Sequence, residues 1–223
     1  MSTTSAVLLD LLAAAVPAGG RAWVAALTDA GAPARFTSDF AAATRRAGSG
    51  PLALDAGGVA CLRGVGLDWP VDEWTMDDLA RVAMLVNAAE RLAPDAFAAL
   101  VADCHAHGDL EERRAVLRAL PLLPDAGRFV ALAVDACRTN VRSLFEAIAC
   151  DNPFPAAHFP EPAFNQMVLK TVFQGVPLAR LVGLGARSGA ELRRMARDYA
   201  RERRAAGRPV SADLRALAGQ EDA

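Results

Sequence analysis

Apolar side chains recur every three to four residues along almost the whole chain, which is the period of an amphipathic α-helix. The clearest example is residues 75–90, where Thr75 is a candidate N-cap and the apolar positions between Leu79 and Val86 share one face. We expect this helix to bury that face alone. Residues 129–137 are apolar on two faces, so we expect them to run through the centre of the fold.

Proline and glycine divide this pattern into segments of helical length. Pro94 suits a first helical turn and Gly108 suits a helix end. Near the C-terminus, Ser188 and Glu191 have the spacing of a capping box, and an apolar stripe follows them. Short connections between such helices predict an all-α fold of antiparallel neighbours, arranged either as a stacked α-α superhelix or as a helical bundle.

Residues 48–70 interrupt the helical pattern with several glycines. We expect an irregular insertion there, with room for a short hairpin around Asp55 and Gly58. This segment contains apolar residues, such as Leu52 and Leu62, that can be buried against the rest of the chain. We therefore expect a single domain over residues 1–223.

Composition supports the helical interpretation and narrows the classes of partner. Of the 223 residues, 53 % are hydrophobic and only 6 % are aromatic, which favours close-packed helices over a β-sandwich. A net charge of −2 provides no global basic field for nucleic acid, and no apolar run is long enough for a membrane span. The N-terminus lacks the basic region of a signal peptide, and the dispersed cysteines suit reduced thiols, so we expect a cytoplasmic protein.

One stretch, residues 150–175, departs from the rest of the chain. It holds four of the thirteen prolines, four of the nine phenylalanines and the single lysine, Lys170, in a chain with 23 arginines. Either a compact ammonium was needed at position 170, or an arginine would not fit there. The prolines predict a helix that ends near Asp151, an irregular loop, and a second helix from Pro162 to Gly175.

The second helix of this stretch is apolar on almost every side, which indicates burial. Its polar stripe consists of Gln166, Lys170 and Gln174, four residues apart, with Asn165 beside it. Three interpretations remain open. These groups brace the carbonyls of the proline-rich loop, or they converge with His158 and the helix N-terminus on an anionic ligand, or they form an exposed surface for a partner.

The sequence of residues 150–184 resembles the signature of the EboA family, whose members are encoded in the ebo gene cluster of cyanobacteria and other bacteria. The resemblance implies a role in making or moving a secondary metabolite, for which an isoprenoid with a polar headgroup is a plausible structure. It implies no assigned reaction. The partners would be enzymes of the same cluster or the metabolite itself.

We therefore expect a non-enzymatic accessory protein, a scaffold or a metabolite-binding protein, that serves biosynthesis or export. The alternative is an enzyme that acts on a phosphorylated or prenylated intermediate through Lys170, His158 and Glu161. We predict no catalytic residue, cofactor or metal; His105 and His107 suit the end of a helix better than a metal site. The candidate ligand or partner site comprises Asp151, Asn152, His158, Glu161, Asn165, Gln166, Lys170 and Gln174.

The C-terminal segment, residues 187–208, is strongly basic, with eight arginines against three acids. A solvated helix crossed by ion pairs explains this composition. The alternative is a weak peripheral contact with anionic lipid or with an acidic partner through Arg193, Arg194, Arg197 and Arg201. Nucleic acid is excluded as a partner, because no aromatic or glycine-rich phosphate motif accompanies these charges.

Overall fold

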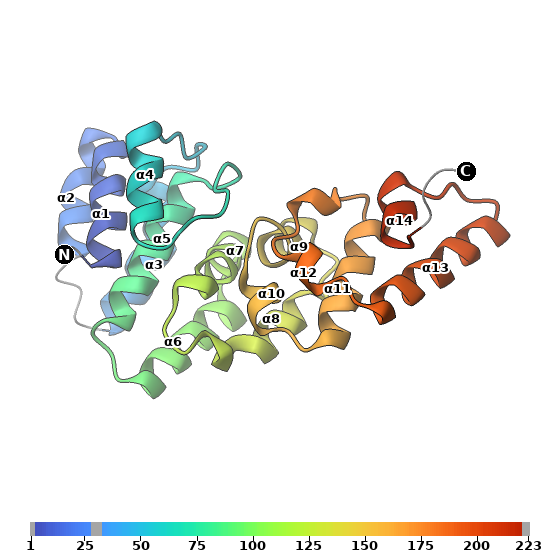
Figure 1. The fold of residues 1–223 in the computed structure, drawn as a ribbon. Helices are drawn as coiled ribbons and strands as arrows, with labels where there is room; N and C mark the ends of the chain where they lie inside the picture. Colours follow the sequence, from blue (N-terminus) through green and yellow to red (C-terminus); the bar gives the residue numbers. More distant parts are fainter. Residues whose placement is uncertain (1–2, 28–32, 220–223) are drawn as a thin grey trace. The chain divides into compact units, whose positions relative to one another are not determined.

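A computed structural model describes residues 3–27 and 33–219 of the chain (Figure 1). Within these ranges the secondary structure consists of packed helices without a β-strand, so the predicted all-α class is confirmed. A single antiparallel bridge joins Pro51 to Thr75. None of the helices in the described part of the chain is both long and apolar enough to cross a membrane.

The chain divides into two compact units, residues 1–148 and residues 149–223. The first unit contains α1 (Thr4–Ala15), α2 (Ala18–Leu27), α3 (Pro33–Ala47), α4 (Ala56–Gly64), α5 (Met76–Ala89), α6 (Pro94–His107), α7 (Leu110–Ala119), η1 (Leu120–Leu122), η2 (Ala126–Phe129), α8 (Val130–Ala136) and nearly all of α9 (Arg142–Ala149). The second contains α10 (Phe154–His158), α11 (Glu161–Phe173), η3 (Leu178–Arg180), α12 (Leu184–Arg187), α13 (Ala190–Ala205) and α14 (Ala212–Leu217). The single domain over residues 1–223 stays a prediction.

Helix α5 lies at the centre of the first unit. Every residue from Asp77 to Ala88 is buried, because α1, α3 and α7 all pack against this helix. The prediction of one buried face was wrong, since alanines placed between the larger residues let neighbours approach on several sides. The prediction for residues 129–137 was also wrong: α8 buries Ala133 and Ala136 but exposes Asp135.

Asp77, in the first turn of α5, is buried and accepts hydrogen bonds from Arg81 (2.7 Å), Thr44 (2.9 Å) and Thr75 (2.6 Å). Burial alone would raise the pKa of Asp77, but these hydrogen bonds outweigh burial and lower it. The resulting stabilisation is therefore present above the ordinary pKa of an aspartate and is lost as the pH falls through the lowered value. Because Thr44 lies on α3, the contact ties α3 to α5.

Asp78, the next residue, ties α5 to α7. Its fully buried carboxylate accepts hydrogen bonds from the backbone N–H of Thr75 (2.9 Å) and from Arg114 (3.0 Å), and it also pairs with Arg118. The bond to Thr75 completes a capping box at the start of α5. The first turn of this helix therefore contacts two of its three main neighbours, α3 and α7.

The glycine-rich segment contains a helix where we expected irregular chain with a hairpin. Asp55 is the N-cap of α4, and its side chain accepts a hydrogen bond from the N–H of Gly58 (2.8 Å). Leu62 is buried. The hairpin prediction was wrong because the aspartate before the two glycines starts a helix instead of entering a turn.

We expect Asp78→Ala to lower the free energy of unfolding by about 3 kcal/mol, because it removes the common acceptor of two largely buried arginines. Urea unfolding followed by circular dichroism measures the change. The control is Asp95→Ala, whose ion pair with Arg128 is exposed (95 % and 40 %) and should contribute less than about 0.5 kcal/mol. Equal losses in the two variants would contradict a structural role for the buried network.

Candidate functional site

The stretch that the sequence singled out begins with two residues that end a helix. Asp151 has a left-handed backbone (φ +51°), and Asn152, which is buried, accepts a hydrogen bond from the N–H of Phe154 (2.9 Å). This Asx-type contact starts α10, with Pro155 in its first turn. The loop is therefore more ordered than the irregular segment that we predicted.

Two arginines hold this loop from outside it. Arg180, on η3, forms an ion pair with Asp151 (2.7 Å), and its carbonyl accepts the N–H of Asp151 (2.7 Å). Arg187, at the end of α12, donates to the carbonyls of Ala156 (2.6 Å) and Phe159 (2.7 Å). Arg187 thus satisfies backbone acceptors that the proline-interrupted chain leaves unpaired.

The Arg187 guanidinium also lies 4.6 Å from the ring centroid of Phe164, in the first half of α11. A planar cation can donate along its edge and stack with its face, which an ammonium cannot do. Near this contact the backbone of Gly183 lies close to Ala156. A Cβ at position 183 would lie 2.6 Å from the Cβ of Ala156. The bracing that we considered for Lys170 and its neighbouring amides is provided at these two carbonyls by Arg187.

Helix α11 follows the predicted boundaries. Pro162 lies in its first turn, and Gly175 follows its last turn with φ +69°. Phe164, Met167 and Val168 are buried, as the apolar pattern predicted. The remaining face of the helix is the one that forms the site.

Helices α11 and α13 meet near their N-terminal ends. Gly189 is the N-cap of α13, and a Cβ at this position would lie 3.5 Å from the carboxylate of Glu161, the first residue of α11. From this meeting point the two helices lead in different directions (Figure 1). The space between α11 and α13 is therefore wedge-shaped, and we call it the wedge.

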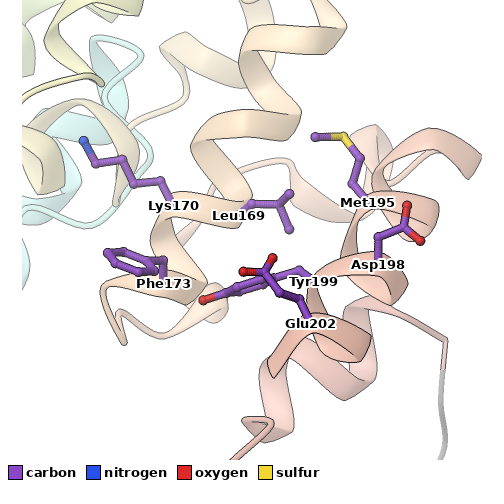
Figure 2. A pocket seen from close by; sticks show the side chains of 7 residues that line it. All are labelled: Leu169, Lys170, Phe173, Met195, Asp198, Tyr199 and Glu202. Atoms are coloured by element: carbon purple, nitrogen blue, oxygen red, sulfur yellow. The ribbon is translucent and has the colours of Figure 1, made fainter. Parts of the chain in front are cut away.

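The wedge contains an open groove of about 590 Å³. Figure 2 shows its lining side chains, which come from both helices. They are Leu169, Lys170 and Phe173 of α11, and Met195, Asp198, Tyr199 and Glu202 of α13. Phe173 is 70 % exposed, an unusual exposure for a phenylalanine, so the apolar floor is open to solvent.

Three of the side chains that line the groove are charged, namely Lys170, Asp198 and Glu202. In Figure 2 the Lys170 ammonium points away from Met195 and Asp198. Asp198 pairs with Arg194 (2.8 Å) and also with Arg201. Hydrogen bonding from Arg201 lowers the pKa of Asp198, which therefore stays ionised at neutral pH.

The predicted site residues lie in several places, and Lys170 is the one among them that lines the groove. Asp151 and Asn152 order the loop, as described above. His158 is exposed, with its ring centroid 4.8 Å from that of Phe154. Glu161 is exposed at the start of α11.

The three amides of α11 differ in their surroundings. Gln166 is exposed, and Gln174 is half-buried near the end of the helix. Asn165 is only 1 % exposed. The predicted polar stripe therefore faces several environments and does not converge on one point.

Sequence reasoning missed the part of the groove contributed by α13. The signal was the stripe in which Met195 and Tyr199 follow Leu192. We predicted only an apolar stripe here, without a binding role, and Met195 and Tyr199 are half-buried. The divergence of α11 and α13, which no local pattern encodes, opens this stripe to solvent.

The start of α13 also differs from the prediction. Gly189, not Ser188, is the N-cap, and the Ser188 hydroxyl donates to the carbonyl of Leu184 (2.9 Å). The predicted capping box is therefore wrong, and Glu191 pairs with Arg194 (2.7 Å). These contacts are those of a solvated helix crossed by ion pairs.

The histidine cluster in the first unit shows no metal geometry. His107 is exposed and contacts Asp103 (2.9 Å). His105 is half-buried, and burial together with the charge of Arg113 lowers its pKa. Within the described ranges, no three side chains of metal-binding type are grouped together.

These features define an all-α protein whose C-terminal unit carries an open groove with an apolar floor and charged side chains in its lining. A family model described as metabolite traffic protein EboA matches residues 5–219. The chain therefore belongs to the EboA family, as the resemblance in residues 150–184 indicated. Neither the curated proteins nor the solved structures gave a significant match.

We expect Arg187→Ala to lower the free energy of unfolding by about 2–3 kcal/mol, because two loop carbonyls lose a charged donor. Arg187→Lys should recover little of this loss, since one ammonium cannot reproduce the fork and the ring contact. Denaturant unfolding measures both changes. Arg197→Ala, an exposed arginine of α13, is the control and should stay within about 0.5 kcal/mol of the wild type.

Proposed function

We propose that this chain is a non-enzymatic accessory protein that binds the apolar part of a metabolite in the groove between α11 and α13. The observation that carries the proposal is the open apolar floor, above all Phe173 at 70 % exposure. Exposed apolar surface of this kind usually marks an interaction site. The family description, metabolite traffic, agrees with cargo binding.

The dimensions and lining of the groove suit a small molecule. Its volume of about 590 Å³ lies within the roughly 300–1,000 Å³ of typical ligand sites. Leu169 and Met195 offer flexible aliphatic surface, and Phe173 and Tyr199 offer flat rings. Such a floor suits a branched hydrocarbon, and an isoprenoid chain is the class that we propose.

The charged groups of the lining leave the polar end of a ligand near solvent. Asp198 and Glu202 come from α13, and Lys170 comes from α11 with its ammonium directed away from Asp198. An open groove with the polar end of the ligand near solvent suits a carrier, because the cargo can then enter and leave without a covalent step. We place the function in the cytoplasm, where enzymes of the same cluster would supply and receive the metabolite.

The enzymatic alternative is less well supported by the geometry. It requires Lys170, His158 and Glu161 to act on one substrate. Glu161 and Lys170 are nine residues apart on one helix, so they are separated by about 13 Å along its axis. His158 lies outside the groove lining. A scaffold role toward pathway enzymes stays compatible with cargo binding.

We expect the protein, isolated from cells that carry the whole gene cluster, to retain a small apolar molecule detectable by native mass spectrometry. Phe173→Asp should reduce the retained amount roughly tenfold or more, because a carboxylate on the floor would be desolvated by the ligand. Since Phe173 is mostly exposed, this substitution should leave the fold intact. Circular dichroism checks that point.

The matched control is Val141→Asp, which places the same charge on another exposed apolar residue (43 % exposed) outside the groove. It should retain the wild-type amount of ligand. Equal retention by the two variants would contradict binding in the groove. Absence of any retained molecule from the wild type would contradict the carrier function itself.

A further inference from the structure

Among residues 149–219, Asn165 is the one side chain that is almost completely buried and whose polar atoms are unpaired. It is 1 % exposed, and neither its Oδ1 nor its Nδ2 has a hydrogen-bond partner in residues 3–27 and 33–219. Three other residues in the described part of the chain have an unpaired buried side-chain atom, but all three are only half-buried: His105, Arg113 and Gln174. Asn165 therefore requires a separate explanation.

The position of Asn165 on α11 shows which way its side chain faces. Glu161, Asn165, Leu169 and Phe173 are spaced four residues apart and share one stripe of the helix. Glu161 lies against the N-cap of α13, and both Leu169 and Phe173 line the groove. Asn165 thus lies between the meeting point of α11 and α13 and the inner end of the groove.

An unpaired buried amide weakens the unliganded protein by about 1–3 kcal/mol. An apolar side chain at this position would avoid that penalty. An asparagine offers an acceptor oxygen and two donor hydrogens. A neutral group that both donates and accepts, such as a hydroxyl or a carboxamide, would satisfy both ends of the side chain, whereas a full charge would be desolvated there at a larger penalty.

We infer that Asn165 is the specificity-determining residue of the groove and binds a neutral hydroxyl or carboxamide of the ligand, while the apolar body of the ligand lies over Phe173 and Tyr199. This inference rests on the proposed function. Leu169 is half-buried one turn beyond Asn165, and we expect its side chain to shift when the polar group enters. A rotamer change at one leucine is a small rearrangement.

The location of Asn165 also indicates that the head group it binds is not an anion. Lys170 lies five residues after Asn165 on α11, about 140° around the helix axis, so the two side chains leave the helix in different directions. An anion held by Lys170 would therefore leave the amide of Asn165 unpaired. The head group that enters the inner end of the groove is uncharged.

The test uses three probes with one alkyl chain and different head groups: 1-decanol, decyl phosphate and decyltrimethylammonium. Each is titrated into the ¹⁵N-labelled full-length protein, and the side-chain amide signals of Asn165 are followed by NMR. We expect 1-decanol to bind most tightly and to shift those signals. Asn165→Leu should weaken 1-decanol binding about fivefold, the effect of one hydrogen bond.

The unliganded variants provide an independent readout. Asn165→Leu should raise Tm, because it removes an unpaired buried amide. Gln166→Leu changes an exposed amide next to it and should leave both Tm and 1-decanol affinity unchanged. A lower Tm in Asn165→Leu would show that the amide is already satisfied and would overturn the inference.

The failure of the inference is distinguishable from that of the proposed function. If the probes bind and shift signals of Leu169 and Phe173 but leave Asn165 unchanged, the inference is overturned and groove binding stands. Tighter binding of decyl phosphate than of 1-decanol would likewise overturn it in favour of an anion site. If none of the three probes binds, both proposals fail.

Discussion

The architecture of the second unit depends on one side chain, Arg187, which donates to two carbonyls of the proline-rich segment before α11. Prolines remove N–H donors, so the chain before α11 needs donors from elsewhere. The guanidinium supplies them to Ala156 and Phe159 and packs against Phe164. Because Arg187 ends α12, just before α13 begins, the same contact brings the N-terminal ends of α11 and α13 together.

The groove follows from this constraint. Two helices that meet at one end and diverge cannot pack along their whole length, so the apolar residues beyond the meeting point stay open to solvent. Leu169 and Phe173 on α11, with Met195 and Tyr199 on α13, are the residues so exposed. In the first unit the buried charges of Asp77 and Asp78 are fully paired and join helices. The buried carboxylates of the first unit therefore have a structural role. The buried amide of Asn165 makes no such contact, and for that reason we assign it to ligand binding.

The sequence predicted elements whose signals are local. Pro162 and Gly175 bounded α11, and its apolar pattern correctly indicated the burial of Phe164, Met167 and Val168. The prediction that almost every side of the helix is buried was wrong, because Phe173 is 70 % exposed. Asp55 was misread because an aspartate before glycines suits both a turn and a helix start. Lys170 drew attention by its rarity, but the cation that donates to the carbonyls of Ala156 and Phe159 is Arg187, one of 23 arginines. Its role depends on a contact with residues about 30 positions away, which no periodicity reveals.

The central claim is that the wedge between α11 and α13 holds an apolar ligand, and photo-crosslinking tests it most directly. A decanol analogue with a diazirine in its alkyl chain is irradiated with the full-length protein, and the labelled residues are identified by peptide mass spectrometry. The account predicts labels in residues 169–173 and 195–202, with excess 1-decanol suppressing them. Suppressible labelling confined to the apolar surface formed by Leu181, Leu184 and Leu217, or to the first unit, would contradict it.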